Sequence, residues 1–261
     1  MHLTEKNSVF IVKIDNKNLN QMKTSKSLTI AILLIVLTSC VDGQFYRSIR
    51  GNGNVIKKER PAPYFDGINV STGIDVYLTQ GESEKIIVET DENLHDYLMT
   101  EVKNGTLRIY FDNVSIRSAE RKRVYVTMKD IRSLRTSSAG DIIGESPVKC
   151  GDILLESSSA GNIKLELYAR NVNVKISSSG DISLSGEAET LNADLSSAGD
   201  LNAFDFKVKD ADLNVSSAGD ADIYVTHKLI ARVSSAGDVR YAGEPEIIDA
   251  RTSSAGTVHK R

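Results

Sequence analysis

The sequence predicts an all-β protein, built as a right-handed parallel β-solenoid with a less regular N-terminal portion. Three observations support this fold class. The tetrapeptide Ser-Ser-(Ala/Ser)-Gly recurs at intervals of 18 to 21 residues, apolar and polar residues alternate on both sides of it, and the interval is about half of what a propeller blade requires. The tetrapeptide occurs seven times, and its glycines are Gly140, Gly161, Gly180, Gly199, Gly219, Gly237 and Gly256.

Each repeat is predicted to be a strand, a corner and a second strand. Apolar residues occupy the position six before each glycine and the position two after it, as Val174 and Ile182 do around Gly180, whereas the position five before it, here Lys175, is polar in every repeat. One such unit cannot bury its apolar face alone, so consecutive coils are expected to stack about 4.8 Å apart. The preference of parallel crossovers for the right hand predicts the sense of the coil.

The corner tetrapeptide has a physical role in this prediction. Its small Ser and Ala side chains let neighbouring coils approach, and its glycine is expected to adopt the positive φ of the bend. The residue after the glycine is expected to accept hydrogen bonds from backbone N–H groups of the turn. In stacked coils these residues form one row, here called the corner column: Asp141, Asn162, Asp181, Asp200, Asp220 and Asp238.

The corner column has an alternative interpretation as a Ca²⁺ site. Carboxylates spaced about 4.8 Å apart concentrate negative charge, and oxygen-rich corners hold Ca²⁺. Against this, Asn162 interrupts the row, and the pattern lacks the paired glycines and shorter period of the calcium-binding nonapeptide repeat. We therefore expect a structural column without a cofactor and keep Ca²⁺ as the alternative.

Residues 61–135 are expected to form an irregular N-terminal part of the solenoid, ahead of regular coils at 136–261. Residues 65–78 are interpreted as a degenerate first coil, because the Ser-Thr-Gly-Ile-Asp at 71–75 echoes the later corner. The dipeptide Asn104-Gly105 predicts a hairpin with a primed turn. The other predicted elements are strands at 53–57, 85–90 and 124–128, and a helical turn at 91–98 that begins at an acidic cap.

The N-terminus contains an expected export signal. A short basic stretch at 22–26 precedes an apolar run at 28–37 that is too short to span a bilayer as a stable helix. The Leu-Thr-Ser-Cys at 37–40 resembles the bacterial lipobox, in which small residues enter the signal peptidase and the thiol of Cys40 takes a diacylglycerol. We expect a lipoprotein signal peptide at 22–39 and a lipid anchor and tether at 40–60, and we interpret residues 1–21 as an extension of the gene model.

Charge and composition exclude several classes of protein. Without residues 1–39 the chain keeps 222 residues with 27 basic and 33 acidic side chains, and this negative balance argues against nucleic acid as a partner. A composition that is 40% hydrophobic can bury a core, so disorder throughout is not expected. Two cysteines are too few for a disulfide scaffold, and lipidation of Cys40 would leave Cys150 as a lone thiol.

The Phe-Asp-Gly-Ile-Asn-Val at 65–70, followed by the Ser-Ser-Ala-Gly-Asp repeats, resembles the bacterial family called "putative auto-transporter adhesin, head GIN domain". The Gly-Ile-Asn at 67–69 is the motif behind that name, and the resemblance covers roughly residues 60–245. It implies a single-stranded right-handed parallel β-helix of the pectin-lyase-like kind, on a cell-envelope protein of a Bacteroides-like bacterium. It brings no catalytic residues. Surface-exported lipoproteins of some Gram-negative bacteria have an acidic cluster just after the lipidated cysteine, whereas here Asp42 is the one acid just after Cys40. An outer-membrane lipoprotein on the periplasmic face and one on the cell surface therefore both remain open.

The leading functional hypothesis is a non-enzymatic envelope lipoprotein. It would contact the membrane through its lipid anchor, and its Ser- and Asp-rich face would bind a glycan or an envelope protein in an adhesin-like role. The alternative is a carbohydrate-active enzyme, a polysaccharide lyase or hydrolase, because such enzymes place carboxylates in one groove of a similar scaffold. The four histidines lack metal-ligand spacing, and no nucleophile or paired-cysteine motif occurs. We expect no catalytic and no metal-binding residues.

Overall fold

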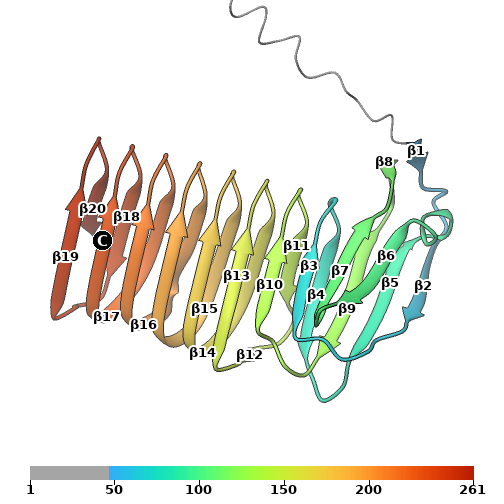
Figure 1. The fold of residues 1–261 in the computed structure, drawn as a ribbon, viewed down its shortest axis with the longest axis horizontal. Coiled ribbons are helices and arrows are strands. Elements are labelled where there is room, and N and C mark those ends of the chain that lie inside the picture. Colours follow the sequence, from blue (N-terminus) through green and yellow to red (C-terminus); the bar gives the residue numbers. More distant parts are fainter. Residues whose placement is uncertain (1–46) are drawn as a thin grey trace, which may run out of the picture. The chain divides into compact units, whose positions relative to one another are not determined.

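The computed structural model describes residues 47–261, and these residues form a β-solenoid (Figure 1). Two parallel sheets face each other, one made of the strands that precede each corner and one of the strands that follow it. In Figure 1 the chain runs up the near sheet, turns at the corner, runs down the far sheet and advances from right to left, which is a right-handed path. The predicted all-β class and the right-handed parallel β-solenoid are confirmed.

The two sheets are named here the pre-corner sheet and the post-corner sheet. Four long strands contribute their first part to the post-corner sheet and their last part to the pre-corner sheet of the next coil: β14 (Asn162–Ile176), β15 (Asp181–Leu195), β16 (Asp200–Val215) and β17 (Asp220–Val233). The pre-corner sheet also contains β7 (Thr106–Phe111), β3 (Gly67–Val70), β10 (Ser133–Thr136), β13 (Asp152–Ser157) and β19 (Ile247–Thr252). The post-corner sheet also contains β9 (Lys122–Met128), β4 (Asp75–Gln80), β11 (Asp141–Gly144), β18 (Asp238–Ala242) and β20 (Thr257–Lys260). The short strand β12 (Val148–Lys149) pairs with the middle of β14.

The core lies between the two sheets and is built from the alternating apolar positions. Equivalent residues of consecutive coils stack directly, so Ile182 pairs in register with Ile163 on one side and Leu201 on the other, and Ile182 is 0% exposed. Lys175 is exposed, as the phase of the alternation predicts. Because each strand inside the stack lies between two others, a core side chain there packs against its counterparts above and below, which confirms the assigned phase.

The corner turns differ from the prediction in one respect. The residues with positive φ are the two that precede each glycine, for example Ser178 at 51° and Ser179 at 59°, and not Gly180 itself. The Gly180 N–H donates to the Ser177 carbonyl at 3.1 Å, so the tetrapeptide is a tight turn with two left-handed central residues, the pattern of a type I′ turn. The expectation that the glycine supplies the positive φ is therefore wrong.

Close packing between coils explains the glycine instead. A Cβ atom on Gly180 would lie 2.7 Å from the carbonyl carbon of Ser157 and 2.8 Å from its oxygen, in the coil beneath. The left-handed residues are held by a hydrogen bond between coils, because the Ala160 N–H donates to the Ser178 carbonyl and the Ser179 N–H donates to the Ser197 carbonyl. Contacts of the same kind recur along the corner edge, and they offset the cost of the unusual backbone.

The N-terminal part supplies the first coil and a cap over the end of the solenoid. Strand β3, the corner at 71–74 and strand β4 form the first coil, with Asp75 in register with Asp141, which agrees with the degenerate coil predicted there. Strand β6 (Leu98–Lys103) pairs antiparallel with β7 around Asn104 and Gly105, which both have positive φ, so the primed hairpin is confirmed. Strands β5 (Lys85–Asp91) and β2 (Val55–Arg60) continue the sheet beyond β9 in antiparallel pairing.

Two predictions for this part need correction. Residues 47–60, expected within the tether, contain strand β1 (Arg47–Arg50), which pairs with β8 (Val114–Ser118), and strand β2, which corresponds to the strand predicted at 53–57. The predicted helical turn exists as a 3₁₀ turn at Glu92–Leu94, but the Asp91 carboxylate does not cap it. That buried carboxylate accepts the N–H groups of Gly53, at 2.6 Å, and Glu120, at 2.9 Å, and thereby holds the N-terminal segment against the body.

Candidate functional site

The structure brings the six predicted residues of the corner column together in one row. Strand pairing places Asp141, Asn162, Asp181, Asp200, Asp220 and Asp238 at equivalent positions of consecutive coils, at the start of the post-corner strands. Asp75 extends the row at one end and Thr257 at the other. Asn162 and Asp220 are exposed, and the other four are partly buried.

The backbone of the turn does not depend on the column carboxylates. The turn N–H groups donate to backbone carbonyls: the Gly161 N–H donates to Ser158, and the Asp181 N–H donates to Gly161, each at 3.0 Å. Two of the carboxylates contact side chains of neighbouring coils, because the Asn162 amide donates to Asp141 at 2.7 Å and the Thr257 hydroxyl donates to Asp238. At Asp141 and Asp238, contacts between coils therefore take the place of the expected caps.

Two carboxyl groups of the row, those of Asp200 and Asp75, have a raised pKa. The pKa of Asp200 is raised above its ordinary value by partial burial and by the neighbouring charges of Asp181 and Asp220. The pKa of Asp75 is raised by burial and by Asp141, while Lys122 and Arg123 oppose the shift. A carboxyl group with a raised pKa in the folded state binds its proton more tightly there than in the unfolded chain, so these groups reduce stability at neutral pH.

Replacing Asp200 with asparagine is expected to raise the melting temperature slightly at pH 7, by an amount equivalent to about 0.5 kcal/mol or less. The substitution removes repulsion, and its amide can donate to a neighbouring carboxylate as Asn162 does to Asp141. The gain should shrink as the pH falls toward 4, because Asp200 of the wild type then takes up its proton. Thermal unfolding from pH 4 to 8 measures the effect.

The same samples test the Ca²⁺ interpretation of the corner column. Among residues 47–261, no group of three or more His, Cys, Asp or Glu side chains is arranged to hold a metal ion. We expect the melting temperature of the wild type to be unchanged by micromolar Ca²⁺. A rise of several degrees that Asp200→Asn abolishes would establish a metal site and contradict the structural interpretation.

A shallow groove of about 720 Å³ lies on the outer face of the post-corner sheet. Two rows of outward side chains line it across the coils, with buried Leu165 and Leu184 below them. The first row contains Lys164, Ser183, Asn202 and Asp222 in register, and the second contains Glu166, Ser185 and Asp205. It is called the Phe204 groove here, after the aromatic residue beside Asp205.

A β-bulge places the Phe204 ring on this outer surface. The coil from Gly199 to Gly219 has 20 residues and the next coil has 18, so the pairing of β16 shifts between Ala203 and Lys207. Ala203 and Phe206 stay buried, and Phe204 and Asp205 are two consecutive residues outside the core. The guanidinium of Arg261 lies 4.7 Å from the centre of the Phe204 ring.

Two of the acids in the groove are engaged by neighbouring side chains. Arg240 donates two hydrogen bonds to the Asp222 carboxylate, at 2.6 and 2.8 Å, and the Tyr168 hydroxyl donates to Glu166 at 3.0 Å. Such contacts hold a carboxylate in one orientation, as a binding surface requires. The groove therefore combines one aromatic ring with amide, hydroxyl and charged groups of fixed position.

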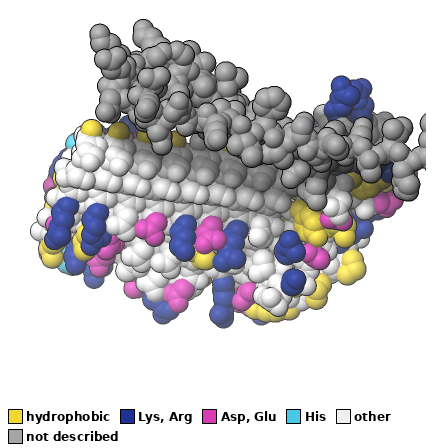
Figure 2. Space-filling view, turned by 45° about the horizontal axis from the view of Figure 1, so that its top comes forward, with side chains coloured by type: hydrophobic (Ala, Val, Ile, Leu, Met, Phe, Trp, Pro, Cys, Tyr) yellow, Lys and Arg dark blue, Asp and Glu magenta, His cyan; other side chains and the backbone are white. Residues whose placement is uncertain are grey.

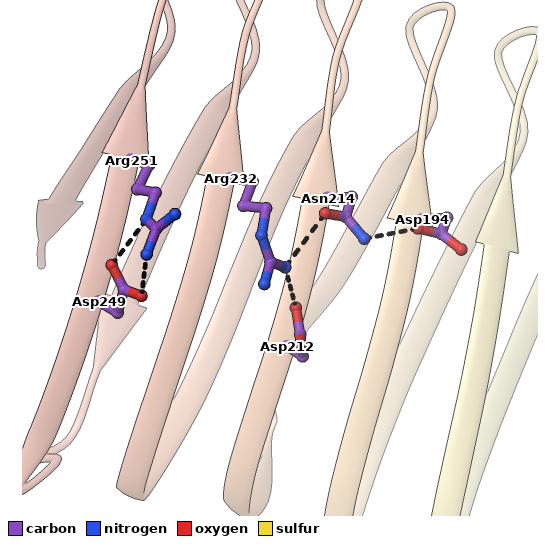
Figure 3. A network of polar contacts seen from close by, with 6 residues as sticks. All are labelled: Asp194, Asp212, Asn214, Arg232, Asp249 and Arg251. Atoms are coloured by element: carbon purple, nitrogen blue, oxygen red, sulfur yellow. Dashed lines mark hydrogen bonds and ion pairs between the residues drawn. The ribbon is translucent and has the colours of Figure 1, made fainter.

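The outer face of the pre-corner sheet has a different character. Charged and amide side chains bond along and between coils: Asn214 donates to Asp194 at 2.9 Å, and Arg232 donates to Asp212 at 2.7 Å (Figure 3). Figure 2 shows Lys, Arg, Asp and Glu side chains spread over this face, next to a mostly uncharged corner edge. Hollows on this face, of about 340 and 400 Å³, are smaller than the Phe204 groove and have no aromatic residue in their lining, so the Phe204 groove is the stronger candidate for a ligand site.

Of the two cysteines, the structure describes Cys150 and does not describe Cys40. Cys40, the expected lipidation site, lies outside the described residues. Burial, assisted by Asp152, raises the pKa of the Cys150 thiol to about 11. A thiol with this pKa is protonated at neutral pH and is a poor nucleophile.

Within residues 47–261, no helix is long and apolar enough to cross a membrane.

Sequence reasoning missed the Phe204 groove. Its residues belong to ordinary outward positions of the alternation, which nothing in one repeat distinguishes from any other outward position. A signal was present in the spacing, because a 20-residue coil directly followed by an 18-residue coil requires a register shift between them. The residues that the shift exposes, Phe204 above all, could have been found from it.

Comparisons with known proteins identify relatives of this chain. A putative adhesin from Bacteroides fragilis is 20% identical, with a TM-score of 0.75, and covers 82% of this chain and 100% of its own. A "putative lipid binding protein" from Parabacteroides distasonis is 27% identical, with a TM-score of 0.69 and the same coverage of both chains. A putative adhesin from Parabacteroides merdae is 24% identical, with a TM-score of 0.66, and covers 82% of this chain and 99% of its own.

No curated protein matches the chain significantly. The family model described as "Putative auto-transporter adhesin, head GIN domain" matches residues 64–245, a span that begins just before the Gly-Ile-Asn motif and contains six of the seven corner glycines. The resemblance inferred from the motif and the repeats is thereby confirmed. The chain belongs to the putative auto-transporter adhesin, head GIN domain family.

Proposed function

We propose that this protein is a cell-envelope lipoprotein that acts as an adhesin-like binding module and takes a glycan in the Phe204 groove. The observation that carries the proposal is the composition of the groove. One aromatic ring offers a flat apolar surface to the C–H face of a sugar, and the surrounding amide, hydroxyl and charged groups offer hydrogen bonds to its hydroxyls. Non-enzymatic binding agrees with the adhesin names of the family and of its solved relatives.

The shape of the groove supports an extended ligand. Ile143 pairs with Lys164 and continues the first row by one coil, so that the row crosses five consecutive strands from Ile143 to Asp222. This corresponds to about 19 Å at the usual spacing of strands. An oligosaccharide can lie along such a row and contact each coil in turn. The groove is shallow and open, so it would not enclose an acyl chain, and this favours a glycan over the lipid named for the Parabacteroides distasonis relative.

Replacing Phe204 with alanine is expected to weaken glycan binding by at least about tenfold, because aromatic anchors carry a large share of the energy at such sites. The measurement is a screen of envelope glycans and glycan fragments with the full chain, followed by titration calorimetry on the best ligand. Tyr64→Ala is the matched control, since Tyr64 is an aromatic residue that is 56% exposed outside the groove.

The outcomes separate the alternatives. Equal binding by the wild type and Phe204→Ala would contradict the groove assignment, and failure to bind any glycan would contradict the ligand class. Release of shortened or unsaturated sugars during incubation would support the carbohydrate-active enzyme. Binding to vesicles of phosphatidylethanolamine and phosphatidylglycerol that depends on Phe204 would support a lipid ligand.

Replacing Cys40 with serine is expected to release the protein from the membrane fraction or to block its processing. The proposed anchor requires a thiol, and a hydroxyl at this position cannot form the thioether with diacylglycerol. Cell fractionation and mass spectrometry of the N-terminus measure the effect, with Cys150→Ser as the control that leaves the lipobox intact. Normal maturation of Cys40→Ser with retention in the membrane would contradict the lipoprotein proposal.

A further inference from the structure

The last coil of the solenoid leaves core positions uncovered. Ile248 is 48% exposed, whereas Leu229, its in-register neighbour in the preceding coil, is 0% exposed. Ala250 is likewise exposed beside fully buried Ala231. Among the described residues, β19 pairs only with β17 and β20 only with β18, so one edge of each strand is open at the end marked C in Figure 1.

The open edge of β19 presents unpaired backbone groups in a fixed pattern. The Ser253 N–H donates to the Val233 carbonyl at 3.0 Å. Because the N–H and C=O of one residue point to the same side of a strand and successive residues alternate, those of Asp249 and Arg251 also point toward β17. The N–H and C=O groups of Ile248, Ala250 and Thr252 therefore face outward along the solenoid.

The two ends of the solenoid differ in how they oppose pairing. At the N-terminal end the outermost strand of the main sheet, β2, carries exposed Lys57, Lys58 and Glu59. Charged side chains of this kind discourage a second chain from adding to a sheet edge. Strand β19 instead carries the two exposed isoleucines of the described chain, Ile247 at 47% and Ile248. Of these two edge strands, β19 is the one suited to pairing.

We propose that β19 pairs with β19 of a second copy of this chain, in antiparallel register about a two-fold axis at Ala250. The outward backbone groups then form hydrogen-bonded pairs, Ala250 with Ala250 and Ile248 with Thr252 of the other copy. The core side chains of one copy then pack against those of the other, so that the core extends across the interface. The remaining facing pair, Asp249 with Arg251 of the other copy, has opposite charges.

This charge pattern indicates that the strand pairing with β19 belongs to a second copy of the same chain. Within one chain Arg251 donates to Asp249 at 3.2 and 3.1 Å, and the two side chains are 74% and 46% exposed (Figure 3). An antiparallel copy presents the same two charges in reverse order, so each finds a partner across the interface. Because a two-fold interface uses the same strand edge of both copies, the association closes as a dimer and does not grow into a filament.

The test is the oligomeric state of the full chain, measured by sedimentation velocity in a mild detergent that keeps the apolar run at 28–37 from associating. We expect a reversible dimer. Asp249→Arg and Arg251→Asp should each weaken dimerisation about tenfold, because like charges then face each other at two symmetric positions. Lys175→Asp is the matched control, since it makes the same change in the middle of the solenoid and should leave the dimer intact.

Mixing separates pairing between chains from an effect within one chain. An equimolar mixture of Asp249→Arg and Arg251→Asp should restore dimers, since the two chains then carry opposite charges at both positions. Ile248→Asp should give a monomer with unchanged circular dichroism. A monomeric wild type at 100 µM, or a dimer that neither charge reversal weakens, would overturn the proposal. A mixture that stays monomeric would overturn it too.

Discussion

Replacing Gly180 with alanine is expected to lower the free energy of unfolding by about 3 kcal/mol or more. The added Cβ would stand 2.7 Å from the carbonyl carbon of Ser157, and a backbone atom of a paired strand cannot move aside without disturbing the coil beneath. The melting temperature and the urea midpoint should both fall. Circular dichroism during urea titration measures the change.

The control variant introduces a glycine, and this glycine is expected to stabilise the protein. Ser179 has a φ of 59°, so Ser179→Gly removes left-handed strain and should raise the free energy of unfolding by about 0.5–1 kcal/mol. If Gly180→Ala were neutral and Ser179→Gly destabilising, the roles assigned to the two positions would be wrong. The pair of variants thus distinguishes a glycine needed for close approach from a glycine needed for its φ.

Replacing Ile182 with alanine is expected to lower the free energy of unfolding by about 2–4 kcal/mol. Its side chain is fully buried between Ile163 and Leu201, and the neighbouring coils cannot collapse into the cavity because their backbones are paired along their length. Urea denaturation followed by circular dichroism measures the loss.

The matched control for Ile182 lies on the outer face. Lys175 is exposed and forms one contact with Glu156 at 3.8 Å, so Lys175→Ala should change stability by about 0.5 kcal/mol or less. Equal losses at the two positions would show that the inward and outward faces were misassigned. A loss at Ile182 below about 1 kcal/mol would instead indicate a loosely packed interior.

Much of the fold follows from features that repeat. The period of 18 to 21 residues and the alternation around each corner allow only stacked coils, because no other arrangement buries one apolar row per unit. The primed hairpin at Asn104 and Gly105 and the membership of the family were likewise readable, since both depend on short local patterns. The in-register row of the corner column follows from the same period.

Contacts between coils determined what the sequence could not show. The glycine role was misjudged because the restriction on Gly180 comes from Ser157, 23 positions away in the sequence and directly beneath it in space. Asp91 was assigned to a helix cap for a similar reason, since its partners Gly53 and Glu120 are distant in the chain. Local propensity describes neighbours in sequence and carries no information on such contacts.

The sequence by itself therefore determined the solenoid, its right hand, its inward and outward faces and the family. Only the tertiary structure showed the Phe204 groove and the open edge of β19, on which the two proposals rest. The Phe204 groove arises from a mismatch of length between adjacent coils, and the open edge of β19 becomes apparent only from the pairing of strands between coils. Periodicity specifies what all coils share, whereas function depends on the places where one coil differs from the next.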